Sequence, residues 1–308
     1  MKYHLFNGIK ISELTLGTVQ FGLEYSINSV KPNREKSSEI LKNSVNRGIT
    51  SFDTAREYGS SEELIGSFIR EYPEVTVITK FKISPHNMSD FDFAMKEVYE
   101  SVTKSRISLG IKKIPILLFH KGPEHSIEET SKLIPRIMNQ LIEEGWIEMG
   151  GVSVFEVEEI PFLLESEEIQ VLQIPINIMD HRLFRSSIYE KLILKDKIVF
   201  ARSVFLKGLF FRRPESLKGK MDEAIPYLEA LNRLSRKHGM SIAQMAISFV
   251  QDLKGVTSIV LGADNVNQIQ ESINLIQGNE LSEELKKEIF EVFTNVPEKV
   301  ITPRYWGW

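Results

Sequence analysis

Four polar residues could together move a proton to or from a substrate. Asp53 ends an apolar segment, and Tyr58 follows it five positions later. Lys80 and His120 end the next two apolar segments. Free tyrosine has a pKa of about 10, so it transfers protons poorly near neutrality. A lysine ammonium about 4 Å from the phenol, at an effective dielectric near 20, would favour the phenolate by about 4 kcal/mol, which lowers its pKa by up to roughly three units.

The other two side chains complete a set suited to carbonyl reduction. A carboxylate at Asp53 would keep Lys80 charged and fixed, and His120 could donate a hydrogen bond to a carbonyl oxygen. Such a set protonates the oxygen while a hydride reaches the carbon, and the hydride has to come from a cofactor. Two structural alternatives stay open: Asp53 and Lys80 could form only an ion pair, and His120 could be a hydrogen-bonded core histidine.

Eight short apolar segments alternate with amphipathic ones and must position these side chains. Because the apolar segments lack polar alternation, they indicate strands buried on both faces, as in a parallel sheet. The predicted strands are Leu14–Leu16, Thr50–Ala55, Val75–Phe81, Ile114–His120, Met149–Phe155, Val171–Ile178, Ile198–Phe205 and Ser258–Gly262. Helices are predicted at Glu35–Arg47, Glu62–Arg70, Phe91–Ile107, Ile127–Glu144 and Ala224–Lys237, with Gly48 and Gly145 at C-terminal caps.

The alternation predicts a (β/α)8 TIM barrel preceded by a β-hairpin. The hairpin strands, Tyr3–Phe6 and Ile9–Ile11, flank an Asn-Gly turn. An open doubly wound sheet is less favoured because no G-x-G-x-x-G follows the first strand. We predict one domain, 1–308, with a long polar loop at 206–221 after the seventh strand and an aromatic tail at 295–308 that packs back on the barrel.

Composition excludes several other kinds of chemistry. The 308 residues include no cysteine, which rules out disulfide scaffolds, thiolate metal sites and cysteine nucleophiles. The net charge of −4 argues against a nucleic-acid or anionic membrane partner, because both favour a basic surface. No apolar segment approaches the roughly 20 residues of a membrane span. The first residues lack a signal-peptide core, so we expect a cytoplasmic protein.

Several segments, in order along nearly the whole chain, resemble the aldo-keto reductase family. They are Leu14–Thr18, Gly48–Glu62, Ile78–Lys80, Leu117–His120 and Gly151–Phe155. The resemblance implies a TIM barrel whose bottom is closed by the N-terminal hairpin. It also implies carbonyl reduction with Tyr58 as general acid/base, Lys80 and Asp53 as its tuning pair, and His120 as the group that orients the carbonyl.

The same resemblance implies residues that bind NADPH, with NADH as the alternative. Ser153 and Gln173 match the partners of the nicotinamide carboxamide, although Val154 replaces the family's usual Asn. Arg202 stands where the family often stacks an aromatic ring, and Gln268 replaces a frequent arginine for the 2′-phosphate. The full implied set is Thr18, Asp53, Ser153, Gln173, Arg202, Ser203, Gly262 and Gln268. Gln268 has a structural alternative as part of a capping box with Asn265.

The sequence is also compatible with other functions. The expected partner is a small carbonyl compound, with a sugar-like one among the candidates, while the substrate and oligomeric state are open. The chain could instead be a nucleotide-binding regulatory or scaffold subunit of the same fold, as potassium-channel β subunits of this family are, or an aldolase-type barrel with a Schiff base on Lys80. No metal site is predicted. Residues that could contact ligands, or be merely packed or solvated, are Phe21, Tyr25, Trp306, Trp308, Arg212 and Arg213.

Overall fold

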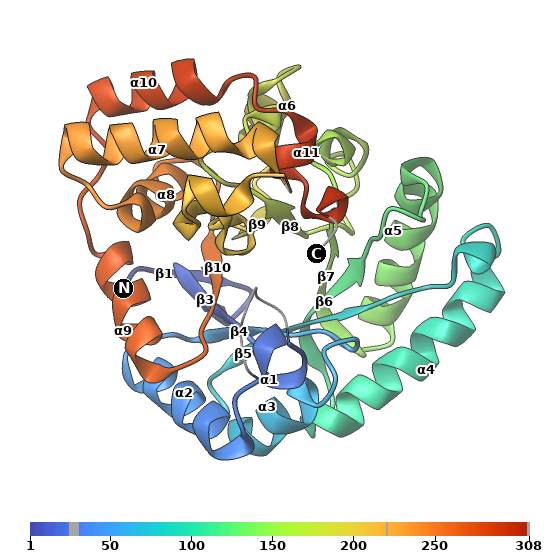
Figure 1. Ribbon diagram of the computed structural model, residues 1–308. Coiled ribbons are helices and arrows are strands. Elements are labelled where there is room, and N and C mark those ends of the chain that lie inside the picture. Colours follow the sequence, from blue (N-terminus) through green and yellow to red (C-terminus); the bar gives the residue numbers. More distant parts are fainter. Residues whose placement is uncertain (25–30, 220, 307–308) are drawn as a thin grey trace.

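Eight parallel strands close into a barrel, as the sequence predicts (Figure 1). The computed structural model describes residues 1–24, 31–219 and 221–306. The barrel order is β10-β3-β4-β5-β6-β7-β8-β9, and β9 pairs with β10 to close it. The strands are β3 (Leu14–Gly17), β4 (Ser51–Asp53), β5 (Thr76–Phe81), β6 (Ile114–His120), β7 (Ile147–Ser153), β8 (Val171–Pro175), β9 (Ile198–Arg202) and β10 (Ser258–Gly262).

Four strands end earlier than the sequence predicts. Strand β4 stops at Asp53 rather than Ala55, and β7 stops at Ser153 rather than Phe155. Strand β8 stops at Pro175 rather than Ile178, and β9 stops at Arg202 rather than Phe205. At the end of β9 the cause is local, because Ser203 adopts φ of 63°, a left-handed conformation that a strand cannot continue through. Apolar residues beyond these ends, such as Ala55, Ile176 and Val204, are buried in loops, which explains why their pattern resembles a strand.

The hairpin β1 (Tyr3–Phe6) and β2 (Ile9–Ser12) covers the amino-terminal ends of the barrel strands. Its turn residues Asn7 and Gly8 both have positive φ, as a two-residue hairpin turn requires. Ile11 packs inside the barrel with Val171 and Ile198, the first residues of β8 and β9. The bottom is therefore closed, which leaves the carboxyl ends of the strands as the open mouth.

The helices surround the barrel strands (Figure 1). They are α1 (Val19–Gly22), α2 (Arg34–Asn46), α3 (Ser61–Ile69), α4 (Phe91–Leu109), α5 (Ile127–Glu143), α6 (Ile188–Leu194), α7 (Ile225–His238), α8 (Ile242–Gln251), α9 (Val266–Ile276), α10 (Glu283–Phe293) and α11 (Glu298–Ile301). Gly48 and Gly145 follow α2 and α5 with φ of 92° and 73°, as expected of glycines that end helices. Among the described residues, no helix is both long and apolar enough to cross a membrane.

The long loop after β9 buries several apolar side chains, although its composition is largely polar and basic. It forms two short 3-10 helices, η4 (Leu206–Phe211) and η5 (Pro214–Leu217), and it buries Leu209, Phe210 and Leu217 in the core. The C-terminal tail forms α11 and η7 (Pro303–Tyr305). Trp306 is only 9% exposed, and its Nε1 donates to the Lys299 carbonyl over 3.0 Å.

Candidate active site

The four residues expected to transfer protons lie at one end of the barrel. Asp53 is the last residue of β4, Lys80 is next to last in β5, and His120 is the last residue of β6. Tyr58 lies in the loop between β4 and α3. Because neighbouring parallel strands end at the same edge, the topology brings these side chains to the mouth.

A buried ion pair with Asp53 fixes the Lys80 side chain close to the Tyr58 ring. The Lys80 side chain is completely buried, and Nζ donates to both carboxylate oxygens of Asp53 over 2.7 and 2.8 Å and to the Thr54 carbonyl over 2.8 Å. Burial lowers the pKa of Lys80, and the Asp53 carboxylate opposes that shift. Nζ also lies 5.2 Å from the centre of the Tyr58 ring. The ammonium is therefore close enough to favour a phenolate at Tyr58.

His120 has a carboxylate partner that sequence reasoning missed. Its Nδ1 lies 3.1 Å from Oε2 of Glu57, the residue before Tyr58, and its ring meets the Tyr58 ring edge-on. Burial lowers the pKa of His120, while the hydrogen bond to Glu57 partly offsets this. Burial alone would raise the pKa of Glu57, but His120 brings it below its ordinary value. This combination favours a neutral imidazole that donates from Nδ1 to a charged carboxylate.

The two residues matched to the carboxamide partners are linked to the same ion pair. Gln173, in β8, donates from Nε2 to Asp53 Oδ1 over 2.8 Å. Ser153, the last residue of β7, donates to Gln173 Oε1 over 3.1 Å. Thr18 donates to the Asp53 backbone carbonyl over 2.9 Å. A continuous hydrogen-bond network therefore joins four strand ends around the Asp53 carboxylate.

A cavity of about 560 Å³, called the larger cavity below, runs from this network towards α8 and α9. Most of the predicted cofactor residues line it: Thr18, Asp53, Gln173, Arg202, Ser203, Gly262 and Gln268. Tyr58 lines its inner end. Ser153 is not among the lining residues and reaches the cavity only through Gln173. The volume falls within the roughly 300–1,000 Å³ typical of small-molecule sites.

The larger cavity has features that a dinucleotide would satisfy. In the described part of the chain, Gln20 Oε1 and Asp264 Oδ1 are buried without a hydrogen-bond partner, and both residues line the cavity. Buried polar atoms are normally bonded, so such exceptions point to a missing ligand group or water. Gln268 takes part in the cap of α9: its backbone N–H donates to Asn265 Oδ1, while its side-chain Oε1 accepts from the Asp264 backbone N–H and not from that of Asn265.

A second cavity of about 340 Å³, called the smaller cavity below, adjoins the larger one. Both are lined by Tyr58, Gln173, Arg202, Ser203 and Lys207. The smaller cavity adds His120 from β6 and residues 301–304 of the tail, so the C-terminal segment forms part of the mouth. It therefore lies on the side of Tyr58 where His120 stands.

Aromatic side chains do line the two cavities, but they are not the ones that the sequence suggested. Phe21 is buried in the core and Trp306 packs on the tail, whereas Phe155, Phe205 and Phe211 line the two cavities. Tyr25 and Trp308 lie outside the described residues. Aromatic content alone could not tell these phenylalanines from the others in the chain.

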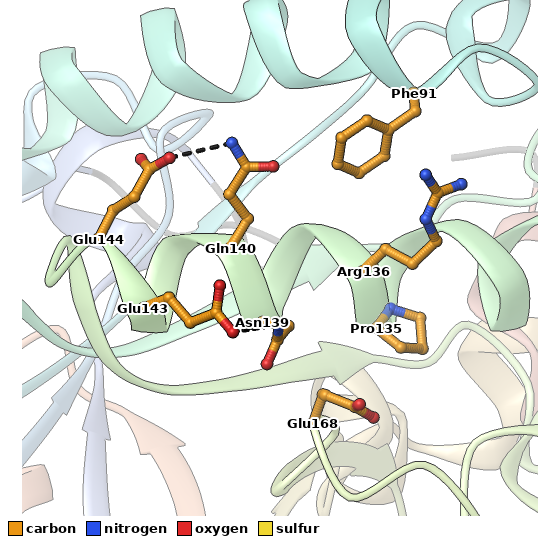
Figure 2. Close-up of a pocket in the computed structure, with 8 residues that line it drawn as sticks. All are labelled: Phe91, Pro135, Arg136, Asn139, Gln140, Glu143, Glu144 and Glu168. Atoms are coloured by element: carbon orange, nitrogen blue, oxygen red, sulfur yellow. Dashed lines mark hydrogen bonds between the residues drawn. The ribbon is translucent and has the colours of Figure 1, made fainter.

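A hollow of about 490 Å³ on the outside of the barrel shares none of these residues (Figure 2). It follows α5, and its amides and carboxylates bond to one another, as in the pairs Gln140–Glu144 and Asn139–Glu143. The Arg136 guanidinium lies 4.3 Å from the centre of the Phe91 ring. Since these groups already satisfy one another, we assign no function to this hollow.

The fold places His238 beside two carboxylates. Its imidazole, Glu284 and Glu288 are close enough to hold an ion between them. Lys237 already binds Glu288 over 2.6 Å and Glu284 over 3.3 Å, so its ammonium compensates both acids. The grouping is a surface ion-pair network, and we propose no metal site there.

Comparison with known proteins agrees with this geometry. A model of the aldo/keto reductase family matches residues 13–292. Aldo-keto reductase YhdN of Bacillus subtilis (strain 168) is 26% identical over 324 residues, covering 97% of this chain and 95% of that protein. A "Probable voltage-gated potassium channel subunit beta" of Arabidopsis thaliana is 24% identical over 309 residues, covering 89% and 88%.

A solved structure has the same fold. Aldo-keto reductase AKR11C1 from Bacillus halodurans superposes with a TM-score of 0.76 at 19% identity, covering 98% of this chain and 99% of that one. The family match spans the barrel strands and all four mouth residues. The chain therefore belongs to the aldo/keto reductase family and is an oxidoreductase of that family.

Proposed function

We propose that this protein reduces an aldehyde or ketone to an alcohol with NAD(P)H, and that Tyr58 donates the proton. The observation that carries the proposal is the position of Tyr58 above the buried Lys80–Asp53 pair, at the point where the two cavities meet. A cofactor in the larger cavity and a carbonyl compound in the smaller one would both reach the phenol there.

Each residue has a defined task in this mechanism. Tyr58 Oη protonates the carbonyl oxygen and is left as a phenolate, which the Lys80 ammonium stabilises. Asp53 keeps Lys80 charged despite its burial. Gln173, Ser203 and Gly262 would hold the cofactor in the larger cavity. When bound, the nicotinamide supplies the hydride for the carbonyl carbon. In reverse, the same phenolate would accept the proton of an alcohol.

The shape and chemistry of the larger cavity support the binding of a nicotinamide cofactor there. Its outer end is lined by Asp264, Gln268 and Glu271, and its inner end by Arg202 and Lys207. The unpartnered Gln20 Oε1 can accept a hydrogen bond from a nucleotide hydroxyl or amide. The polar lining of the smaller cavity supports a polar, sugar-like carbonyl compound over a purely apolar one.

Replacing Tyr58 with Phe tests the proposal. Oxidation of NADPH and of NADH is followed across aldehydes, ketones and keto-sugars, and cofactor binding is followed by fluorescence. Tyr58→Phe should lose nearly all turnover, at least the 10²–10⁴-fold typical of a lost general acid, and should keep cofactor affinity. The matched control is Tyr3→Phe, at an exposed tyrosine of β1 in the hairpin that covers the other end of the barrel. Retained activity in Tyr58→Phe would rule out the assigned role.

A regulatory or scaffold role is the second candidate. The similarity over 89% of this chain to an Arabidopsis protein described as a probable channel subunit is the observation that favours this role. Tight nucleotide binding without turnover of any carbonyl compound would support this alternative. A Schiff base on Lys80 is less favoured, because Nζ is fully buried and already binds three oxygen atoms.

A further inference from the structure

The smaller cavity is lined by far more positive than negative charge. Its cationic residues come from five parts of the fold: Lys82, Lys121, Arg182, Arg202, Lys207 and Arg304. Glu156 is the one carboxylate among the described lining residues. The chain as a whole has a net charge of −4, so composition does not explain this excess. A charge asymmetry focused in a concave site attracts ligands of the opposite sign.

Three of these cations are compensated by carboxylates. Arg182 binds Asp180 and Glu156, each through a contact of 2.6–2.7 Å. Lys121 binds Glu159 over 2.7 Å. Arg304 lies 3.4 Å from Glu156 and 3.5 Å from Glu298. These groups form part of the cavity wall, but carboxylates of the protein already compensate most of their positive charge.

Two further cations form no ion pair with a carboxylate in the described part of the chain. Arg202, at the end of β9, donates to Ser203 Oγ over 3.0 Å and to the Val154 carbonyl over 2.9 Å, both of them uncharged acceptors. Lys82 follows β5 and is exposed; its charge acts on Glu57, which His120 already binds. Arg202 and Lys207 line both cavities, and the pKa of Lys207 is lowered by burial first and by the Arg202 charge second. The mouth thus holds positive charge that the fold itself does not neutralise.

An unpartnered hydroxyl lines the same cavity. Thr302 is only 5% exposed, and its Oγ1 is a buried oxygen without a hydrogen-bond partner in the described structure. It belongs to the tail segment 301–304, which reaches the mouth from the C-terminus. A hydroxyl donor beside guanidinium and ammonium groups matches the hydrogen-bonding demand of a carboxylate or phosphate.

We propose that the smaller cavity binds an oxyanion, so that the substrate is a short carbonyl compound carrying a carboxylate or phosphate group. This rests on the proposed reductase function, because Tyr58 and His120 line the same cavity and must meet the carbonyl of the same molecule. Arg202 and Lys82 hold the oxyanion, with Thr302 as a hydroxyl donor. The carboxylate and phosphate sources share this chemistry, and matched substrates separate them.

The test compares substrate pairs that differ in the anionic group, at saturating cofactor. Succinic semialdehyde is paired with butanal, and glyceraldehyde 3-phosphate with glyceraldehyde. We expect kcat/KM to be at least about tenfold higher for the anionic member of one pair, and to fall with added salt because screening weakens the attraction. The pair that shows the preference identifies the source. Equal or lower kcat/KM for both anionic members overturns the proposal.

Charge-removing variants locate the subsite. Lys82→Gln and Arg202→Gln should each reduce the anionic-to-neutral ratio of kcat/KM by about tenfold, with cofactor affinity measured separately because Arg202 also lines the larger cavity. Lys112→Gln, an exposed lysine at the opposite end of the barrel, is the matched control and should leave the ratio unchanged. Unchanged ratios in both mouth variants contradict the assignment.

Equilibrium binding measurements test the oxyanion site even if the protein turns over no carbonyl compound. Calorimetric titration with inorganic phosphate and with succinate should show binding that weakens in Lys82→Gln and not in Lys112→Gln. Binding without turnover would reject the reductase function and retain the oxyanion site. Turnover of the neutral aldehydes without anion binding would reject the site and retain the reductase.

Discussion

Gln173 donates a hydrogen bond to the same Asp53 carboxylate that binds Lys80, over 2.8 Å. Gln173, which the family resemblance matches to a residue that binds the nicotinamide carboxamide, is thus hydrogen-bonded directly to the proposed proton-transfer pair. Replacement of Gln173 should therefore affect two properties at once. Gln173→Leu removes one of the hydrogen bonds to Asp53 Oδ1, which keeps Lys80, and it removes the acceptor of the Ser153 hydroxyl, at a cost of about 1–3 kcal/mol for the unsatisfied buried group.

For Gln173→Leu we expect a lower free energy of unfolding, measured in urea, together with weaker nucleotide binding, measured by fluorescence titration. Gln251→Leu is the matched control, because Gln251 donates to the Ile276 carbonyl and neither residue lines the two cavities. It should lower stability and leave nucleotide affinity as it is. Equal nucleotide affinity in the wild type and Gln173→Leu would show that Gln173 is purely structural.

The positions of three of the four proposed proton-transfer residues could be predicted because they depend on regular structure. Asp53, Lys80 and His120 lie at the ends of consecutive parallel strands, and that follows from apolar segments separated by helices. The family resemblance implies a cofactor role for Gln173 and Ser153, but it does not imply their hydrogen bonds to the Asp53 network. Those bonds depend on strand register around the closed barrel, which a single sequence does not reveal.

Other features depend on irregular backbone and could not be predicted. Glu57 meets His120 only because the loop after β4 turns its side chain towards β6. Arg304 is distant in sequence from every other lining residue outside the tail, yet it helps form the smaller cavity. The early end of β9 depends on the left-handed conformation of Ser203, which is unusual for a residue other than glycine.

Glu57 should act as a positioning residue through His120. The groups that face the imidazole are Glu57, Tyr58, Lys80 and Lys82; the Glu57 hydrogen bond raises its pKa, whereas burial and the two lysines lower it. Glu57→Gln removes the carboxylate and keeps the size of the side chain. The remaining influences all lower the pKa, so His120 should titrate at lower pH in this variant.

Histidine NMR resonances, assigned with His120→Asn, measure this titration, and the pH profile of kcat/KM should move in the same direction. Glu128→Gln, an exposed carboxylate at the start of α5, is the matched control and should leave the His120 titration in place. A titration unchanged by Glu57→Gln would mean that the carboxylate does not control the charge of His120.

His181 should make the folded state sensitive to acid. It is 5% exposed and stacks on Phe249, and burial lowers its pKa to about 4, with Asp180 and Arg185 as the charged neighbours. Between its unfolded pKa of about 6.5 and the folded value, the unfolded chain binds more protons. Stability is therefore fully present above pH 6.5 and falls as the pH drops towards 4, by about 3 kcal/mol at most.

His181→Phe keeps an aromatic ring among Phe249 and Phe290 but cannot be protonated. It also loses the bond to the Ile178 carbonyl, which lowers stability equally at every pH. The free energy of unfolding should decline less steeply from pH 6.5 to 4 in this variant than in the wild type. The exposed His86, changed to Ala, controls for loss of a histidine in general. Parallel curves for wild type and His181→Phe would show that His181 is not the acid-sensitive group.

Gln268 should determine how well the protein distinguishes NADPH from NADH. It lines the outer end of the larger cavity with Asp264 and Glu271, and the cations on that lining, Arg202 and Lys207, lie at the inner end. Among the described residues that line this cavity, those at the outer end would offer a 2′-phosphate carboxylates and no cation. We therefore expect NADH to bind the wild type at least as tightly as NADPH, and Gln268→Arg to improve the affinity for NADPH relative to NADH by about tenfold, or about 1.4 kcal/mol.

Nucleotide fluorescence titrations measure both affinities without any substrate. Gln268→Arg also removes the side-chain acceptor for the Asp264 backbone N–H, so a general loss of stability has to be separated from a change in preference. Gln277→Arg places the same charge at the exposed C-terminal end of α9, outside the cavity, and should leave the NADPH-to-NADH ratio unchanged. An unchanged ratio in Gln268→Arg would place the 2′-position of the nucleotide away from this residue. A shift in both variants would mean that the long-range charge of the surface, and not a contact at Gln268, sets the preference.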